Sequence, residues 1–325
     1  MGWKGTVRSV NAALNQMERD AQQRQREYQR QQQQLAKMAE LDRAAAEVDL
    51  FEQYIQALVT PHHNDAPDVD WAGLVNSQEP GWVEPAPTTT ASAEKALADY
   101  KPSRLTTKKR QERQLADLQA AVERGRISDE QSRLDALADH EVAVQQWRRD
   151  RELAGQILAG DRKAWREASV AIDALAATDY LRYIDLNVPD EGEPTVTFGV
   201  QSQDIVPSQQ KSLLQSGKLS TKAMPKGQFY EIYQDYVAGT LLWVANTVLG
   251  LLPIPEIVAT GSIHMLNPAT GHLEETPVLS ALVPRATIGQ MNLERLDPSE
   301  GLANFKHVMN FKKTQGFTAI TPISG

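Results

Sequence analysis

The first sixty residues constrain this chain more than any other part of it. The stretch from Thr6 to Thr60 contains neither proline nor glycine and is rich in residues that favour helices. From Leu14 to Met38 one heptad register holds apolar residues at all seam positions except Arg24 and Gln31, and after a one-residue shift apolar residues continue at spacings of three and four from Leu41 to Leu58. This pattern predicts a coiled-coil helix over residues 1–60 rather than a disordered glutamine-rich tract.

Such a helix needs a partner, because an apolar edge is not stable in water. The partner could be a later part of the same chain, a second copy, or another helical protein that contacts residues 14–58. Basic residues dominate the first half of the helix and acidic residues the second half, which favours antiparallel over parallel self-pairing. The residues that we expect at the contact, called the seam residues here, are Leu41, Val48, Phe51, Ile55 and Leu58.

The middle of the chain predicts a linker and then more helices. Residues 61–103 begin with Pro61 and are rich in Pro, Thr, Ser and acidic residues, which is typical of a linker. Residues 104–178 regain helical periodicity. Gly125 indicates a helix stop and Ser128 a new N-cap, so the pattern predicts a helical hairpin or coiled coil.

Residues 179–325 predict a compact α+β domain with a mainly antiparallel sheet. Two pairs of β-rich segments, before and after a long apolar helix over residues 227–252, predict two hairpins with this helix buried at the centre. The lysine-rich segment 211–227 reads as a flexible loop. Asp297 is a good N-cap, which predicts a last helix over residues 297–311, followed by an edge strand over residues 316–323.

Composition limits the class of protein only loosely. The chain has no cysteine and a formal net charge of -8, so it depends on no disulfide and is not basic overall. The uncharged run 237–254 is long enough to approach a membrane span, but Glu231 and Asp235 precede it on the same helix and Asn246 interrupts it, which favours a buried core helix. Residues 1–16 lack the apolar core of a secretory signal, so we expect no membrane span and a cytoplasmic location.

Candidate chemistry rests on lysines and histidines. His264, His272 and His307, together with Glu274 and Glu275, could form a metal-dependent hydrolytic site, but their spacing matches no known ligand pattern. The segment SGKLST fails the phosphate-loop pattern. Since none of these patterns is complete, we predict no catalytic residue, no metal ligand and no cofactor. Six lysines could form a rim that binds phosphate groups of nucleic acid: Lys211, Lys218, Lys222, Lys226, Lys312 and Lys313.

Two segments also carry a resemblance. KSLLQSGKLSTKAMPKGQFYEIYQDYV and LNPATGHLEETPVLS, with the glutamine- and arginine-rich N-terminal helix, resemble a family of uncharacterised bacterial proteins that combine an N-terminal coiled coil with a C-terminal α+β domain. The resemblance implies a bacterial and cytoplasmic setting and no catalytic residue.

These observations favour a non-enzymatic assembly or interaction protein. Its coiled coil would oligomerise or bind a partner, and its α+β head would recognise a second molecule. One alternative is a nucleic-acid-associated component that binds phosphates through the lysine rim. The other is a metal-dependent hydrolase that uses the C-terminal histidines.

Overall fold

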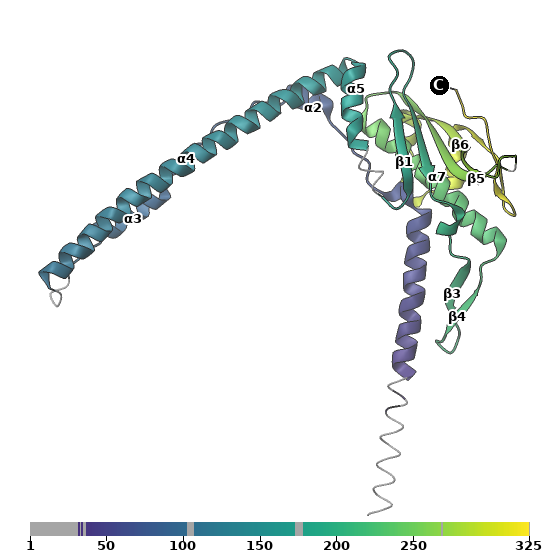
Figure 1. Ribbon diagram of the computed structural model, residues 1–325, viewed down its shortest axis with the longest axis horizontal. Coiled ribbons are helices and arrows are strands. Elements are labelled where there is room, and N and C mark those ends of the chain that lie inside the picture. The colour runs from purple at the N-terminus through teal and green to yellow at the C-terminus, as the bar shows by residue number, and fades with distance from the viewer. Residues whose placement is uncertain are drawn as a thin grey trace, which may run out of the picture. The chain divides into compact units, whose positions relative to one another are not determined.

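The computed structural model describes residues 32, 34, 37–102, 107–172, 178–267 and 269–324 (Figure 1). Contacts divide the chain into two compact units, Met1–Asp68 with Ala168–Gly325, and Val69–Glu167. The second unit is therefore inserted into the sequence of the first. The expected α+β class is confirmed, with long helices and a mainly antiparallel sheet. No helix among the described residues is both long and apolar enough to cross a bilayer.

The N-terminal helix is present over residues 37–59 and ends at the 3-10 turn η1 (Pro61–His63), where proline was expected to end it. Residues 1–31, 33, 35 and 36 lie outside the described part of the chain. The heptads from Leu14 to Leu35 therefore remain a prediction, whereas the half of the helix from Leu41 to Leu58 can be examined directly.

The sheet of the first unit has five strands in the order β1-β2-β5-β6-β7. All neighbouring pairs are antiparallel except β2 and β5, which run parallel because the long helix α7 (Lys226–Leu251) returns the chain between them. Both expected hairpins are confirmed. The strands are β1 (Leu181–Asn187), β2 (Thr195–Val200), β5 (Glu256–Leu266), β6 (Leu273–Pro284) and β7 (Lys306–Met309).

Helix α7 is the core of this unit, as its apolar sequence predicted. It packs on β5 and β2, and its residues from Ile232 to Leu251 are buried almost without interruption. Its other side contacts the segment that follows the N-terminal helix. Gly239 lies against Pro61 and His62, and Gly250 lies against Pro67, so only glycine leaves room for these contacts.

Residues 209–223 form a hairpin, where a flexible loop was predicted. Strands β3 (Gln209–Leu213) and β4 (Leu219–Ala223) pair antiparallel, and the turn between them uses Gly217 at φ 76°. A glycine is favoured there because other residues rarely adopt this left-handed conformation. The alternation of polar and apolar residues in this hairpin is weak, which explains why the sequence pattern did not reveal it.

The predicted last helix is wrong except for its first turn. Asp297 does cap α9 (Pro298–Gly301) by accepting hydrogen bonds from the amides of Ser299 and Glu300. The chain then forms β7, because pairing with β6 outweighs local helix propensity. The predicted edge strand shrinks to β9 (Gly316–Phe317), which pairs with β8 (Phe311–Lys312). The remaining short elements are η2 (Val170–Ile172), η3 (Gln203–Ile205), α8 (Arg285–Ile288), η4 (Leu293–Arg295) and η5 (Leu302–Asn304).

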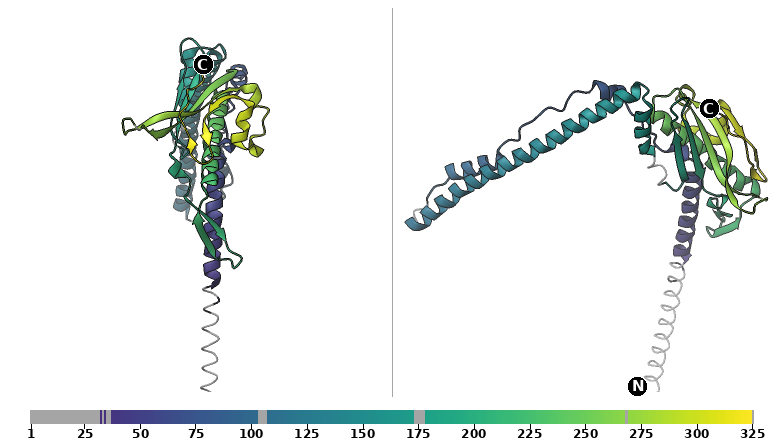
Figure 2. Two further views of the ribbon diagram at one scale, coloured as in Figure 1. Left: turned by 90° about the vertical axis from the view of Figure 1, so that its right-hand side faces the viewer. Right: turned by 45° about the horizontal axis from the view of Figure 1, so that its top comes forward.

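The second unit is built on one 51-residue helix, α4 (Lys108–Leu158). Helices α2 (Trp71–Asn76) and α3 (Thr88–Ala98) pack on it, and both lie in the segment that was predicted to be a linker. Figure 1 and the right view of Figure 2 show α3 lying alongside α4. The short helix α5 (Arg162–Ser169) follows α4 after a turn at Gly160.

The predicted helical hairpin with a turn at Gly125 is wrong, because α4 passes through Gly125 and Ser128 without a break. Gly125 instead lets α3 approach. A β-carbon at this position would lie 3.0 Å from both the amide nitrogen and the α-carbon of Thr90. Asp129, one turn later, accepts hydrogen bonds from the amides of Thr89 and Thr90 at 3.2 and 2.7 Å and so caps α3.

Candidate functional site

The seam residues are covered in part by the chain itself. Val48 and Leu58 are buried, whereas Leu41, Phe51 and Ile55 are half-buried. The β3–β4 hairpin provides part of the cover, since the side chain of Leu41 lies against Gly217. Two ion pairs join the helix to the same hairpin, Glu47 to Lys211 at 3.0 Å and Glu40 to Lys218 at 3.6 Å.

The lysines that could form a phosphate-binding rim are partly engaged elsewhere. Lys211 and Lys218 pair with the N-terminal helix, and Lys313 pairs with Glu231 on α7 at 3.2 Å. Each of these ammonium groups is already next to a carboxylate, which lowers its attraction for an anion. Lys222 lies on β4, Lys226 begins α7 and Lys312 lies on β8.

The three C-terminal histidines do not come together. His264 lies on β5, His272 lies beyond its end in the hairpin turn, and His307 lies on β7 rather than on a helix. The Nδ1 atom of His307 is 3.1 Å from the carbonyl oxygen of Phe305. Within the described ranges no group of three or more His, Asp or Glu side chains is placed to hold a metal ion.

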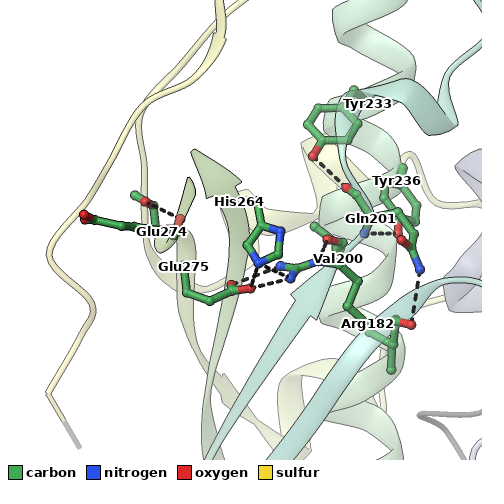
Figure 3. A network of polar contacts seen from close by, with 10 residues as sticks. Arg182, Val200, Gln201, Tyr233, Tyr236, His264, Glu274 and Glu275 are labelled. Carbon is green, nitrogen blue, oxygen red and sulfur yellow. Dashed lines mark hydrogen bonds and ion pairs between the residues drawn. The ribbon is translucent and has the colours of Figure 1, made fainter. Parts of the chain in front are cut away.

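One of these histidines does belong to a charged cluster on the sheet (Figure 3). Arg182 on β1 forms a two-pronged ion pair with Glu275 on β6, and its Nη2–Oε2 distance is 3.0 Å. The Nε2 atom of His264 lies 2.8 Å from both Arg182 Nη1 and Glu275 Oε1. The hydrogen bond with Glu275 raises the pKa of Arg182, so the guanidinium remains charged.

Arg182 also connects this cluster to a loop. Its Nε donates to the carbonyl oxygen of Val200 at 2.7 Å, and the next residue, Gln201, is held by two tyrosines of α7 (Figure 3). Tyr233 donates its hydroxyl to the carbonyl oxygen of Gln201 at 2.9 Å, and the amide of Gln201 donates to the hydroxyl of Tyr236 at 2.9 Å. Burial raises the pKa of both hydroxyls, so they stay neutral and serve to fix the loop.

A pocket of about 620 Å³ opens beside this loop, within the first unit. The end of the N-terminal helix forms one wall and the segments before β1 and after β2 form the other. Tyr54 donates to the carbonyl oxygen of Ile205 at 2.6 Å, and Tyr180 donates to that of Ala57 at 3.2 Å, so both phenols bridge the walls. The described lining is Tyr54, Ala57, Leu58, Asp179, Tyr180, Gln201, Ser202 and Ile205.

This pocket presents polar groups beside apolar surface. Asp179, Gln201 and Ser202 offer a carboxylate, an amide and a hydroxyl, and the tyrosine rings offer apolar area, which together suit a small polar ligand. The sequence pattern did not indicate Asp179, Gln201 and Ser202 as site residues. They lie in segments outside the strands that come together only in the folded unit, and no spacing along the chain could have indicated them.

The second unit presents a different surface, along α4. Successive residues of a helix are rotated by about 100°, so Val122, Gly125 and Asp129 share the side that contacts α3. Ile127, Leu134 and Val142 fall within about 80° of one another on the opposite side. Ile127 and Val142 are each 67% exposed and Leu134 is 46% exposed. With the exposed alanines in the same line, they form what we call the α4 stripe: Ala120, Ile127, Leu134, Ala138 and Val142.

Comparison with known proteins adds no relative to this description. No protein-family model, no curated protein and no solved structure matches the chain.

Proposed function

We propose that this chain is a non-enzymatic assembly protein that binds another helix along the α4 stripe and recognises a second molecule through its α+β head. The observation that carries the proposal is the two-sided character of α4. One side is covered by α2 and α3, and the opposite side repeats apolar residues at helical spacing with no cover among the described residues.

The length of α4 supports this proposal. Its 51 residues span about 75 Å at 1.5 Å per residue, whereas α3, which packs beside it, has only 11 residues. A helix of this length that exposes two isoleucine- or valine-sized side chains and a leucine on one line gains stability when a second helix buries them, at about 25 cal/mol per Å² of apolar surface. Long helices with apolar residues at heptad spacing pair with other helices in coiled coils.

For the head, the pocket beside Gln201 supports recognition of a second molecule. Its two walls are joined by Tyr54 and Tyr180, and the loop that supplies Gln201 and Ser202 is fixed by Tyr233 and Tyr236. A pre-organised loop loses little conformational entropy when a ligand binds, and this raises affinity. The pocket has polar groups from both walls, so the ligand would contact the N-terminal helix and the head together.

The proposal is tested by photo-crosslinking in the cells that produce the protein. A benzophenone amino acid replaces Ile127 or Leu134 on the stripe, and Asp139, exposed on the same helix but outside the stripe, serves as the matched control position. We expect one discrete cross-linked species, identified by mass spectrometry, from positions 127 and 134 and none from position 139. Equal labelling at all three positions, or no cross-link at any, would show that no helix is bound at the stripe.

A further inference from the structure

We infer that the α4 stripe binds the same stripe of a second copy of this chain, with the two α4 helices antiparallel. This inference rests on the proposed function, since it names the helix that covers the stripe. Four polar residues lie in line with the stripe and decide the orientation: Arg124, Gln131, Glu141 and Gln145.

The stripe and these polar residues together follow one heptad register. Ala120, Arg124, Ile127, Gln131, Leu134, Ala138, Glu141 and Gln145 are separated alternately by four and three residues, and all of them are exposed. The register runs for about four heptads, and four of its eight positions are apolar: Ala120, Ile127, Leu134 and Ala138. Val142 lies beside Glu141 and widens the apolar surface at that end.

Charge separates the two possible orientations. Arg124 and Glu141 stand near opposite ends of the register and neither has an ion-pair partner among the described residues. In a parallel pair, each would meet its own copy, and like charges would face each other at both ends. In an antiparallel pair, Arg124 meets the second copy's Glu141 twice, once at each end, so both charges are compensated.

The same antiparallel alignment also matches side-chain size. When Arg124 is opposite the second copy's Glu141, Ile127 is opposite Ala138 and Gln131 is opposite Leu134. Each large apolar side chain then meets a smaller or polar one, so the helices can approach evenly along the contact. The two-fold axis passes between Ser132 and Arg133, and the contact is isologous, as is usual in closed dimers. A second copy therefore fits the stripe in both charge and volume.

The absence of cysteine makes orientation directly testable in the full chain. We would mix one variant carrying Ala120→Cys with another carrying Gln145→Cys under mild oxidation. We expect the mixture to give a disulfide-linked heterodimer, whereas each variant alone gives at most a tenth of that yield. Strong cross-linking of Ala120→Cys to itself would indicate a parallel pair and overturn the inference. Asp139→Cys, mixed with Ala120→Cys, is the control for random collision.

Charge exchange tests the ion pair itself, with sedimentation velocity as the measurement. Arg124→Glu and Glu141→Arg should each weaken the dimer at least tenfold, and the double variant should recover to within about threefold of the wild type, because it restores opposite charges. Circular dichroism confirms that α4 stays helical in each variant. Equal weakening in the double variant, or no weakening in either single variant, would contradict the antiparallel contact.

Failure of this inference can be told from failure of the proposed function. A chain that stays monomeric at high concentration, while positions 127 and 134 cross-link to a different protein, would overturn the self-association and leave the assembly function standing. A monomer that also gives no cross-link at these positions would overturn both.

Discussion

The carbonyl oxygen of Pro67 lies against Gly250 so closely that a β-carbon on Gly250 would be 1.7 Å from it. This contact fixes the segment after the N-terminal helix onto α7, the buried centre of the first unit. It joins two parts of the chain that the inserted unit separates in sequence.

Gly250→Ala should therefore destabilise the first unit. The added methyl group cannot be accommodated without moving the backbone at Pro67, and overpacking of this kind costs about 1–3 kcal/mol. Urea denaturation followed by tryptophan fluorescence measures the loss. Gly227→Ala, in the first turn of the same helix and with nothing within 4 Å of the added carbon, should leave the midpoint unchanged or slightly raised. Equal midpoints for the two variants would contradict the close contact.

The seam of the N-terminal helix should matter for stability even in a monomer. Leu58 is 3% exposed and Leu50 is 66% exposed on the same helix. The same Leu→Ala substitution at the two positions therefore compares a buried site with an exposed control. We expect Leu58→Ala to cost about 2–4 kcal/mol and Leu50→Ala less than about 0.5 kcal/mol. Thermal unfolding at low protein concentration checks this. A similar loss at both positions would mean that the helix is covered by something other than its own chain.

Asp235 on α7 should make the stability of the first unit depend on pH. Burial raises its pKa to about 6, with the nearby carboxylates of Asp297 and Glu231 adding to the effect and a hydrogen bond with Ser299 opposing it. The Oδ1 atom of Asp235 has no hydrogen-bond partner among the described residues. The folded state then binds more protons than the unfolded state between about pH 4 and pH 6, so stability falls as pH rises through this window and levels off above it.

Removing this charge tests the effect. Asp235→Asn should raise the melting temperature by a few degrees (roughly 2–5 °C) at pH 7 and should leave it unchanged below about pH 4. Calorimetry at a series of pH values gives the curve. Asp185→Asn, on an exposed position of β1, is the control and should not change the melting temperature at any pH. A variant that is less stable than the wild type at pH 7 would show that the carboxylate is stabilising instead.

Asp129 should control the first turn of α3. Its hydrogen bonds from Thr90, and then from Thr89, lower its pKa, so the cap is fully formed above the ordinary pKa of an aspartate and is lost as pH falls through the lowered value. Asp129→Ala should speed hydrogen exchange of the α3 amides at neutral pH. Asp135→Ala, two turns further along α4, removes only a bond with Gln131 and should leave α3 protected. Unchanged exchange in Asp129→Ala would rule out the cap.

The parts of the fold that follow from local pattern were predicted correctly. The apolar run of α7 and the β-rich composition of the segments that form β1, β2, β5 and β6 indicated their structure directly, because α7 and β5 are buried along most of their length. Gly125 misled the prediction. A glycine marks a helix end when nothing else is known, but here it makes room for the backbone of Thr90, which is a tertiary requirement.

The candidate sites divide in the same way. The seam residues were accessible to sequence analysis because they repeat along one helix, and Val48 and Leu58 are indeed buried. The pocket residues Tyr180 and Gln201 were not, since they come from separate loops. The α4 stripe was missed because the sequence was divided at Gly125, and the heptad register across Arg124 and Ile127 appears only when α4 is one helix.

The contact between Pro67 and Gly250 also has a consequence during synthesis on the ribosome. Roughly 180 residues separate the two, so at about 5–20 residues per second the N-terminal helix emerges on the order of 10–40 s before α7 is complete. For most of this interval Leu41 and Glu47 lack the β3–β4 hairpin that they contact in the folded unit. The nascent chain therefore exposes the apolar side of its N-terminal helix before its cover has been made. Neighbouring nascent chains on one messenger RNA would present the same apolar surface to each other.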